Sequence, residues 1–267
     1  MRKLGIHHIS ALETDPIEFV DIVSETGCHQ ISVFVNPFTN QTRFPVVTRD
    51  SVPELQEKLQ LTEIEIANIE SFIITPATNV ADFLPFFELG AELSAKGVGV
   101  HLFDADESRV VDNLSQMCEQ AEIFNMDVCI EFLAFTPAWK TLIETEKLIK
   151  QVKLPRLGVG IDLLHLIRSG GSPADIKAID QNLIAYAQIC DSENLGITED
   201  YASEAVGGRL TPGEGVFPIA EFLEALPENV RLEIEVPQPP DRPARERIKR
   251  KRQLMDVPAP IDKSGIF

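Results

Sequence analysis

The chain has 267 residues and a mass of 29.7 kDa, with 44% hydrophobic and 25% charged residues. This composition is typical of a globular protein and excludes wholesale disorder. The 24 Lys and Arg residues against 42 Asp and Glu residues leave a net charge of −18, which disfavours binding to nucleic acid or to anionic membranes. No two of the cysteines form a CxxC pair, so a zinc ribbon is excluded.

The N-terminal segment contains basic residues but no apolar stretch of signal-peptide length. No run of about 18 apolar residues occurs anywhere in the chain, so we expect no membrane-spanning helix. A cytoplasmic location is the resulting expectation.

Short β-type runs alternate with longer helical stretches along the chain. The first helix is predicted to open at Pro16, the second begins with Ser51-Val52-Pro53-Glu54, and the segment after Asp104 is amphipathic. A further helix is predicted around Leu148. In chain order, the predicted strands are 4–10, 30–35, 63–74, 97–103, 127–133, 157–162, 183–191 and 230–236.

The number of strand candidates indicates the architecture. Eight strands in 267 residues give about 33 residues per unit, close to the roughly 30 or more of a βαβ unit. We therefore predict a single (β/α)8 TIM barrel, one domain over 1–267, with a basic C-terminal helix or tail at about 242–267. An open doubly wound sheet is the alternative, but no GxGxxG motif follows a strand to support it.

Acidic residues occur in strands that are otherwise apolar. Glu131 interrupts one such strand and Asp162 ends another, while Glu233 and Glu235 alternate with apolar residues in the last. Because active-site residues of barrels gather at the C-terminal ends of the strands, we expect these carboxylates to meet at one mouth. Buried carboxylates need a cation or a pairing partner, so a metal ion, arginine salt bridges and solvent exposure remain the alternatives. Glu233 and Glu235 share one face of their strand, and which of them joins the cluster stays open.

Three further side chains are candidates for the same mouth. His165 lies one turn beyond Asp162, where it could contact a substrate or serve as a core histidine. The amide oxygen of Gln188 is a suitable ligand for a hard cation, although a core amide would look the same. Arg209 lies in the glycine-rich loop 207–215 and could bind a carboxylate or phosphate, but an ordinary loop has a similar composition.

The remaining candidates are weaker. His101 and His8 lie near the ends of predicted strands, and either could reach the mouth or be buried in the core. Trp139 follows the fifth predicted strand and could form an apolar wall over a substrate or anchor a loop. Glu70 lies at a strand exit without an assignable role.

At these residues the sequence resembles the xylose isomerase-like TIM-barrel superfamily of sugar isomerases and epimerases. The resemblance covers roughly 128–237 and implies that Glu131, Asp162 and Glu235 hold a divalent cation. It also implies that His165 contacts the substrate and that Arg209 binds an anionic group. The motifs that carry it are Ile130-Glu131-Phe132, Asp162-Leu-Leu-His165, Gln188-Ile-Cys-Asp191, Arg209-Leu-Thr-Pro-Gly-Glu-Gly and Glu235-Val-Pro.

One position departs from the family pattern. Gln188 stands where the family usually has a histidine ligand, which is similar to the dehydroshikimate dehydratase branch. The implied metal ligands are Glu131, Asp162, Gln188 and Glu235, and such oxygen donors favour Mn²⁺, Mg²⁺ or Co²⁺ over Zn²⁺. The chain contains only 5 histidines, which argues against the histidine-rich apurinic endonuclease branch.

These observations predict a metal-dependent isomerase or epimerase. Glu131 and Glu235 are the expected catalytic residues, and His165, Arg209, His101 and Trp139 the expected substrate contacts. The expected substrate is a small sugar, cyclic polyol or related hydroxy-ketone, and loss of a β-hydroxyl would instead make the enzyme a dehydratase.

Two other classes remain open. A non-catalytic sugar-binding barrel would have its acids neutralised by arginines. A nucleic-acid role, which the net negative charge disfavours, would depend on the basic run 242–252. That run is typical of a solvated helix face, but it could also pair with acidic surface within the chain or across a homo-oligomer.

Overall fold

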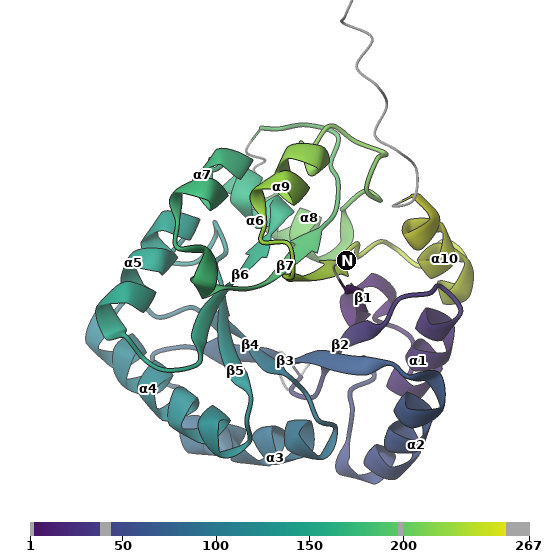
Figure 1. The fold of residues 1–267 in the computed structure, drawn as a ribbon, viewed down its shortest axis with the longest axis horizontal. Coiled ribbons are helices and arrows are strands. Elements are labelled where there is room, and N and C mark those ends of the chain that lie inside the picture. The colour runs from purple at the N-terminus through teal and green to yellow at the C-terminus, as the bar shows by residue number, and fades with distance from the viewer. Residues whose placement is uncertain (1–2, 38–43, 197–199, 255–267) are drawn as a thin grey trace, which may run out of the picture.

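The computed structural model describes residues 3–37, 44–196 and 200–254. Eight parallel strands form a closed barrel in sequential order, as Figure 1 shows. This confirms the predicted (β/α)8 architecture and excludes the open sheet. The strands are β1 (Leu4–His7), β2 (Gln30–Phe34), β3 (Glu65–Ile74), β4 (Gly97–Leu102), β5 (Asp127–Glu131), β6 (Leu157–Asp162), β7 (Ile184–Ile189) and β8 (Arg231–Ile234).

Helices surround this barrel, and local signals in the sequence fix where they begin. Pro16 occupies the first turn of the first helix, and the side chain of Asp15 accepts a hydrogen bond from the backbone N–H of Ile17. Thr141 and Glu144 form a capping box at the start of the fifth helix. The helices are α1 (Pro16–Ser24), α2 (Val52–Thr62), α3 (Leu84–Glu92), α4 (Glu107–Ile123), α5 (Leu142–Val152), α6 (Leu163–Arg168), α7 (Pro173–Ala178), α8 (Tyr201–Gly207), α9 (Ile219–Ala225) and α10 (Ala244–Leu254).

The predicted strands are all present, and most of them end earlier than predicted. The segments 132–133, 190–191 and 235–236 leave the sheet, because the chain turns there into the loops at the C-terminal end of the barrel. The polar residues at these ends therefore lie at the mouth rather than within the sheet.

Strand register places polar side chains at one level of the barrel. Asp162 of β6 pairs with Gln188 of β7, and Gln188 pairs with Glu233 of β8. All three residues are completely buried. Because neighbouring paired residues share a level and a face, these three side chains form a polar layer inside the barrel.

The basic run near the C-terminus packs against the chain itself. Helix α10 lies beside α1 (Figure 1), and Arg247 and Lys251 are buried there. The Lys251 ammonium donates to the carbonyl oxygens of Ser10, at 2.9 Å, and Val236, at 2.7 Å. The run is therefore only partly a solvated helix face, because its cations bind acidic and carbonyl groups of this chain. Residues 255–267 of the predicted tail lie outside the described residues.

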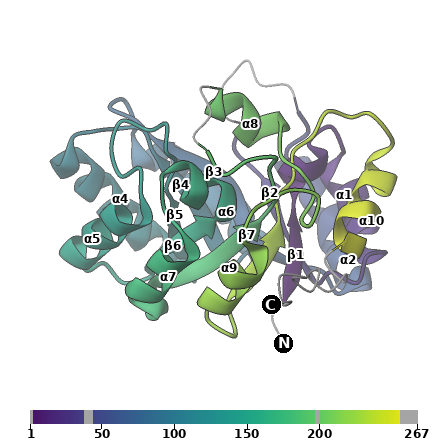
Figure 2. The same cartoon turned by 90° about the horizontal axis from the view of Figure 1, so that it is seen from above.

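Helix α8 stands above the barrel, as Figure 2 shows, whereas the other helices flank the strands. It belongs to the connection between β7 and β8, for which the sequence predicted only a glycine-rich loop. No helix in the described part of the chain is long and apolar enough to cross a membrane.

Candidate metal centre

Three side chains that could bind a metal ion converge at the mouth of the barrel. One ligand atom each of Glu131, Asp162 and His165 lies within 4.8 Å of the other two, and all three residues are buried. Asp162 ends β6 and also caps α6, since its Oδ1 accepts the backbone N–H of His165 at 3.1 Å. This cap places the imidazole of His165 one turn above the carboxylate.

Hydrogen bonds fix the orientation of His165 and Glu131. The Tyr201 hydroxyl pairs with Nδ1 of His165, and Nε2 of the same ring lies 3.3 Å from Oε1 of Glu131. The Tyr186 hydroxyl donates to Oε2 of Glu131 at 2.9 Å. A Cβ atom at Gly160 would lie 2.3 Å from Cζ of Tyr186, so this position needs glycine for the tyrosine ring to reach the carboxylate.

Arg209 lies among the carboxylates. It forms an ion pair with Asp162, and its Nη2 lies 3.1 Å from Oε1 of Glu235. Its Nε donates to the carbonyl oxygen of Ala205 in α8 at 3.0 Å. The arginine pairing that the sequence left as an alternative to a metal is thus present for two of the acids.

The glycine-rich loop that carries Arg209 is held by Asp191. The Asp191 carboxylate accepts backbone N–H groups from Gly213 at 3.0 Å, Gly215 at 2.9 Å and Phe217 at 2.9 Å. Asp191 and Leu210 also form an antiparallel bridge. Asp191 therefore has a structural role, because it fixes the loop next to Arg209.

Several buried polar atoms beside the cluster lack a hydrogen-bond partner among the described residues. These atoms include the hydroxyl oxygen of Ser71 and one carboxylate oxygen each of Glu70 and Glu235, whereas the side chain of Gln188 hydrogen-bonds to that of Glu233. Buried polar groups are normally paired, and unpaired ones indicate a missing ion, water or ligand. Glu70, which had no role in the sequence analysis, is one of the acids inside the barrel.

The acids of the site have different proton affinities. Burial raises the pKa of Glu235 well above its ordinary value, and the charges of Asp162 and Glu131 reinforce this shift against the effect of Arg209. Burial also raises the pKa of Glu70. Burial acts on Glu131 in the same direction, but the hydrogen bond from His165 and the charges of His101, His165 and Arg209 together outweigh it and lower the pKa of Glu131. Glu131 therefore holds a negative charge more readily than Glu235 does.

The donor set fits a divalent cation. Two carboxylates and an imidazole within 4.8 Å of one another are ligands that Mn²⁺, Co²⁺ and Zn²⁺ accept. The buried amide of Gln188 and the unpaired carboxylate oxygen of Glu235 offer further oxygen donors. His165, which the sequence assigned to the substrate, is part of this cluster.

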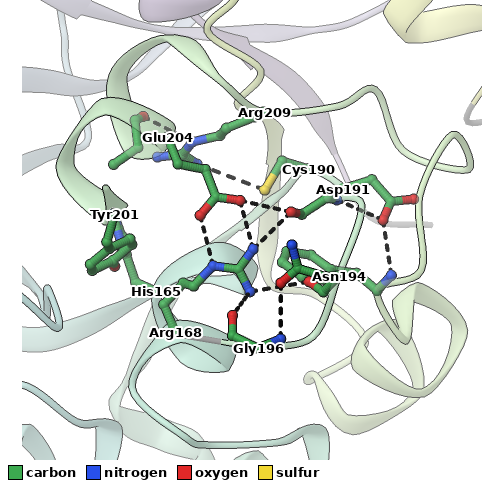
Figure 3. Close-up of polar contacts among 12 residues, drawn as sticks. His165, Arg168, Cys190, Asp191, Asn194, Gly196, Tyr201, Glu204 and Arg209 are labelled. Carbon is green, nitrogen blue, oxygen red and sulfur yellow. Dashed lines mark hydrogen bonds and ion pairs between the residues drawn. The ribbon is translucent and has the colours of Figure 1, made fainter. Parts of the chain in front are cut away.

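A second network holds α8 over the site. The guanidinium of Arg168, which is 1% exposed, binds both carboxylate oxygens of Glu204, at 2.7 and 2.6 Å. It also donates to the carbonyl oxygens of Asn194 and Gly196, as Figure 3 shows. Arg168 thereby ties α8, which carries Tyr201, to the end of α6.

A cavity of about 160 Å³ opens above the cluster. Five of the predicted site residues line it, namely Glu131, His165, Arg209, His101 and Glu235. Asp162 and Gln188 are completely buried and are not among the residues that line it.

Trp139 packs against the hydrophobic core after β5 and is not among the residues that line the cavity. Its role in substrate binding stays a prediction. His7 lines the cavity, whereas His8 turns away and pairs with the carbonyl oxygen of Thr14 at 2.8 Å.

Tyr186, Tyr201 and His7 also surround the site but were not predicted from the sequence. Tyr186 precedes Gln188 by two residues and so shares its face of β7, which is a signal that the sequence contains. His7 could have been found in the same way, from the alternation in β1. Tyr201 could not, because it lies in a segment without strand or helix periodicity.

Comparisons with known proteins agree with this fold. Residues 20–255 match the family model described as xylose isomerase-like TIM barrel. A curated relative, the 3-dehydroshikimate dehydratase of Pseudomonas putida, is 30% identical over 121 residues, which cover 45% of this chain and 19% of that protein. The chain thus matches only about a fifth of this relative's length.

Two solved structures show the same fold at low sequence identity. The structure described as IOLI protein with a binding zinc atom has a TM-score of 0.79 and 17% identity, and the match covers 95% of this chain and 96% of that chain. The D-psicose 3-epimerase with D-tagatose from Clostridium cellulolyticum H10 has a TM-score of 0.70 and 17% identity, with 88% and 85% covered. On the match of the family model, the chain belongs to the xylose isomerase-like TIM-barrel family.

Proposed function

We propose that the protein is a divalent-metal-dependent isomerase or epimerase of a small hydroxy-ketone or hydroxy-aldehyde. The convergence of Glu131, Asp162 and His165 beneath a cavity carries this proposal. The epimerase among the structural relatives supports the reaction class. Gln188 and Glu235 are the further proposed ligands, and Mn²⁺, Mg²⁺ or Co²⁺ the proposed ions.

A bound divalent cation would act as a Lewis acid that polarises the substrate carbonyl. Glu131 and Glu235 both line the cavity, so their carboxyl groups can reach a substrate there. Glu131 would remove the proton from the carbon next to the carbonyl, since its carboxylate is kept ionised. Glu235 would return a proton to the opposite face of the same carbon in an epimerase, or to the neighbouring carbon in an isomerase. Such positioned acid and base groups contribute roughly 10²–10⁴-fold.

Neighbouring side chains would assist this proton transfer. The Tyr186 hydroxyl fixes the orientation of the Glu131 carboxylate. Tyr201 holds His165 in place above Asp162. Because the pKa of His101 is lowered by burial, its imidazole is neutral and could hydrogen-bond a substrate oxygen.

The proposal is tested by exchange of the substrate α-proton with solvent. We expect the protein to catalyse deuterium incorporation from D₂O into a small panel of ketoses and cyclic hydroxy-ketones in the presence of Mn²⁺. EDTA should stop the exchange, and added Mn²⁺ should restore it. Glu131→Gln should abolish it while preserving the far-ultraviolet circular dichroism spectrum. Exchange at the wild-type rate in Glu131→Gln, or after verified metal removal, would contradict the proposal.

A dehydratase is the second candidate. Gln188 supplies a buried amide from β7 where the family usually has a histidine, and the curated relative is a dehydratase. The same proton removal, followed by loss of a β-hydroxyl as water, would give an unsaturated ketone. The appearance of the strong ultraviolet absorbance of such a product, in place of an isomeric ketone, distinguishes the two reactions.

A further inference from the structure

The side chains that line the cavity change from polar at its floor to apolar at its mouth. The floor contains His7, Ser71, His101 and Glu131. Two residues further along the chain from each of them, the lining residues are Ile9, Ile73, Phe103 and Leu133. Four separate β-strand exits thus repeat one pattern, in which a polar residue is followed by an apolar one nearer to the mouth.

Two more apolar residues complete this ring. Phe135 is 39% exposed and Val206 of α8 is 62% exposed, and both line the same cavity. Ring contacts fix Phe135, since its centroid lies 5.1 Å from that of Tyr201 and 6.1 Å from that of Phe103. We call Ile9, Ile73, Phe103, Leu133, Phe135 and Val206 the apolar collar.

The apolar collar provides no side-chain hydrogen-bond partners for a ligand that carries hydroxyl groups on every side. A hydroxyl group buried against these six side chains would lose its bonds to water without gaining a protein partner. A hydrocarbon edge would instead cover apolar surface that is exposed in the free protein. The cavity of about 160 Å³ is below the roughly 300–1,000 Å³ of sites for drug-sized ligands, so the ligand is small.

The charged residues of the lining indicate that the part of the ligand at the collar is uncharged. Arg209 is the one Lys or Arg among the described residues that line the cavity. Its guanidinium is already engaged by Asp162 and Glu235. None of the six collar residues is a Lys or Arg, so an anionic group on the part of the ligand that faces the collar would find no cation there.

We propose that the site selects a compact, uncharged hydroxy-ketone with a bare hydrocarbon edge, such as an unsubstituted ring, over a sugar that carries hydroxyl groups on the carbons beyond its carbonyl. This inference rests on the proposed function for the polar end of the ligand, because the carbonyl and hydroxyl groups point to the acidic floor. The hydrocarbon edge lies against the apolar collar. The collar residues are thus specificity determinants.

Isothermal titration calorimetry of the full chain, with and without Mn²⁺, tests this inference. The probes are 2-hydroxycyclohexanone, which has a bare ring edge, and D-tagatose, which does not. We expect the cyclic probe to bind at least about tenfold more tightly, in line with the discrimination of small apolar groups by apolar pockets. Val206→Gln and Phe103→Gln should each weaken binding of the cyclic probe by about threefold or more and reduce the preference.

The matched control is Ile123→Gln, an apolar-to-amide change at a side chain of α4 that is 76% exposed and does not line the cavity. It should leave both affinities unchanged. Equal or tighter binding of D-tagatose, no binding of the cyclic probe, or unchanged affinity in the folded Val206→Gln variant would each overturn the inference.

The same samples distinguish this inference from the proposed function. If the cyclic probe binds with the expected preference but its α-proton does not exchange with D₂O, the inference on specificity stands and the proposed reaction fails. If D-tagatose exchanges its proton and binds more tightly than the cyclic probe, the reaction stands and the inference fails.

Discussion

Arg209 forms an ion pair with Asp162 deep in the barrel mouth, and the same guanidinium lies 3.1 Å from Glu235. One buried cation therefore balances two carboxylates that are proposed metal ligands. Arg209 and a metal ion would compete for the negative charge of Asp162 and Glu235. Glu131 pairs instead with His165. The first prediction follows from this competition.

Arg209→Gln is expected to have opposite effects on stability and metal binding. Removal of one partner from a buried ion pair costs about 3–5 kcal/mol, because the remaining carboxylates are uncompensated. We therefore expect a lower free energy of unfolding without metal and an affinity for Mn²⁺ that is higher by about tenfold, since like charge is removed. Urea denaturation and calorimetric Mn²⁺ titration measure the two quantities.

Arg247→Gln provides the matched control for this prediction. Arg247 is also buried and pairs with Glu13, but it binds a different part of the barrel. Arg247→Gln should lower the free energy of unfolding without changing the affinity for Mn²⁺. Weaker Mn²⁺ binding in Arg209→Gln would mean that the arginine positions the ligands instead of competing with the ion.

Arg168→Met tests whether α8 is held over the site by the network of Figure 3. The change leaves Glu204 without the two-pronged ion pair, and we expect a loss of about 3 kcal/mol in the free energy of unfolding. KM should rise more than kcat falls, because Val206 of the collar moves with α8. The control is Arg156→Met, which breaks a pair with Asp127 at partly exposed side chains and should cost at most about 1 kcal/mol. Equal losses in the two variants would exclude the anchoring role of Arg168.

The pH dependence of stability should depend on Lys251. Burial, reinforced by the charge of Arg247, lowers the pKa of Lys251 to about 7, whereas the unfolded chain keeps the ordinary value. The unfolded state therefore binds more protons than the folded state between about pH 7 and pH 10, and the contribution of Lys251 to stability rises with pH over that range. The slope is at most about 1.4 kcal/mol per pH unit.

Lys251→Met removes this contribution. The difference in free energy of unfolding between wild type and variant, measured by urea denaturation, should shift in favour of wild type from pH 7 to pH 9.5. A difference that stays constant with pH would show that Lys251 titrates alike in both states.

Gln188→His tests the seventh-strand position. Gln188 is buried and pairs in register with Asp162, so an imidazole in its place would add a nitrogen donor beside the cluster. We expect the ratio of Zn²⁺ to Mn²⁺ affinity to rise by about tenfold or more, because nitrogen ligands favour zinc. Competition titration measures this ratio, and an unchanged ratio in a folded variant would remove Gln188 from the ligand set.

Much of the fold could be predicted because it depends on local patterns. Apolar runs such as Val98–Val100 are buried on both faces of the barrel, and their regular recurrence indicates parallel strands. Glu131 and Asp162 could be recognised as candidate site residues for the same reason, because an acidic side chain in a strand that is buried on both faces is not exposed to solvent. The sequence therefore predicted which strands contribute to the site.

The partners within the site could not be predicted in the same way. Whether Arg209 reaches Asp162 depends on the path of the glycine-rich loop, which Asp191 fixes through three backbone N–H groups. The contact of Tyr201 with His165 depends on the position of α8. This helix has no recognisable signal in the sequence, and Arg168 holds it in place. These contacts join residues far apart in the chain through loops, and loop paths leave no periodic pattern.

The central claim is that the acids at the barrel mouth hold a divalent cation. Elemental analysis of the purified full chain, followed by calorimetric Mn²⁺ titration of wild type and Glu131→Gln, tests it most directly. We expect one ion per chain in the wild type and an affinity lower by about tenfold or more in the variant. Wild-type protein that binds no divalent cation when it is supplied, with Arg209 still paired to Asp162 and Glu235, would contradict it.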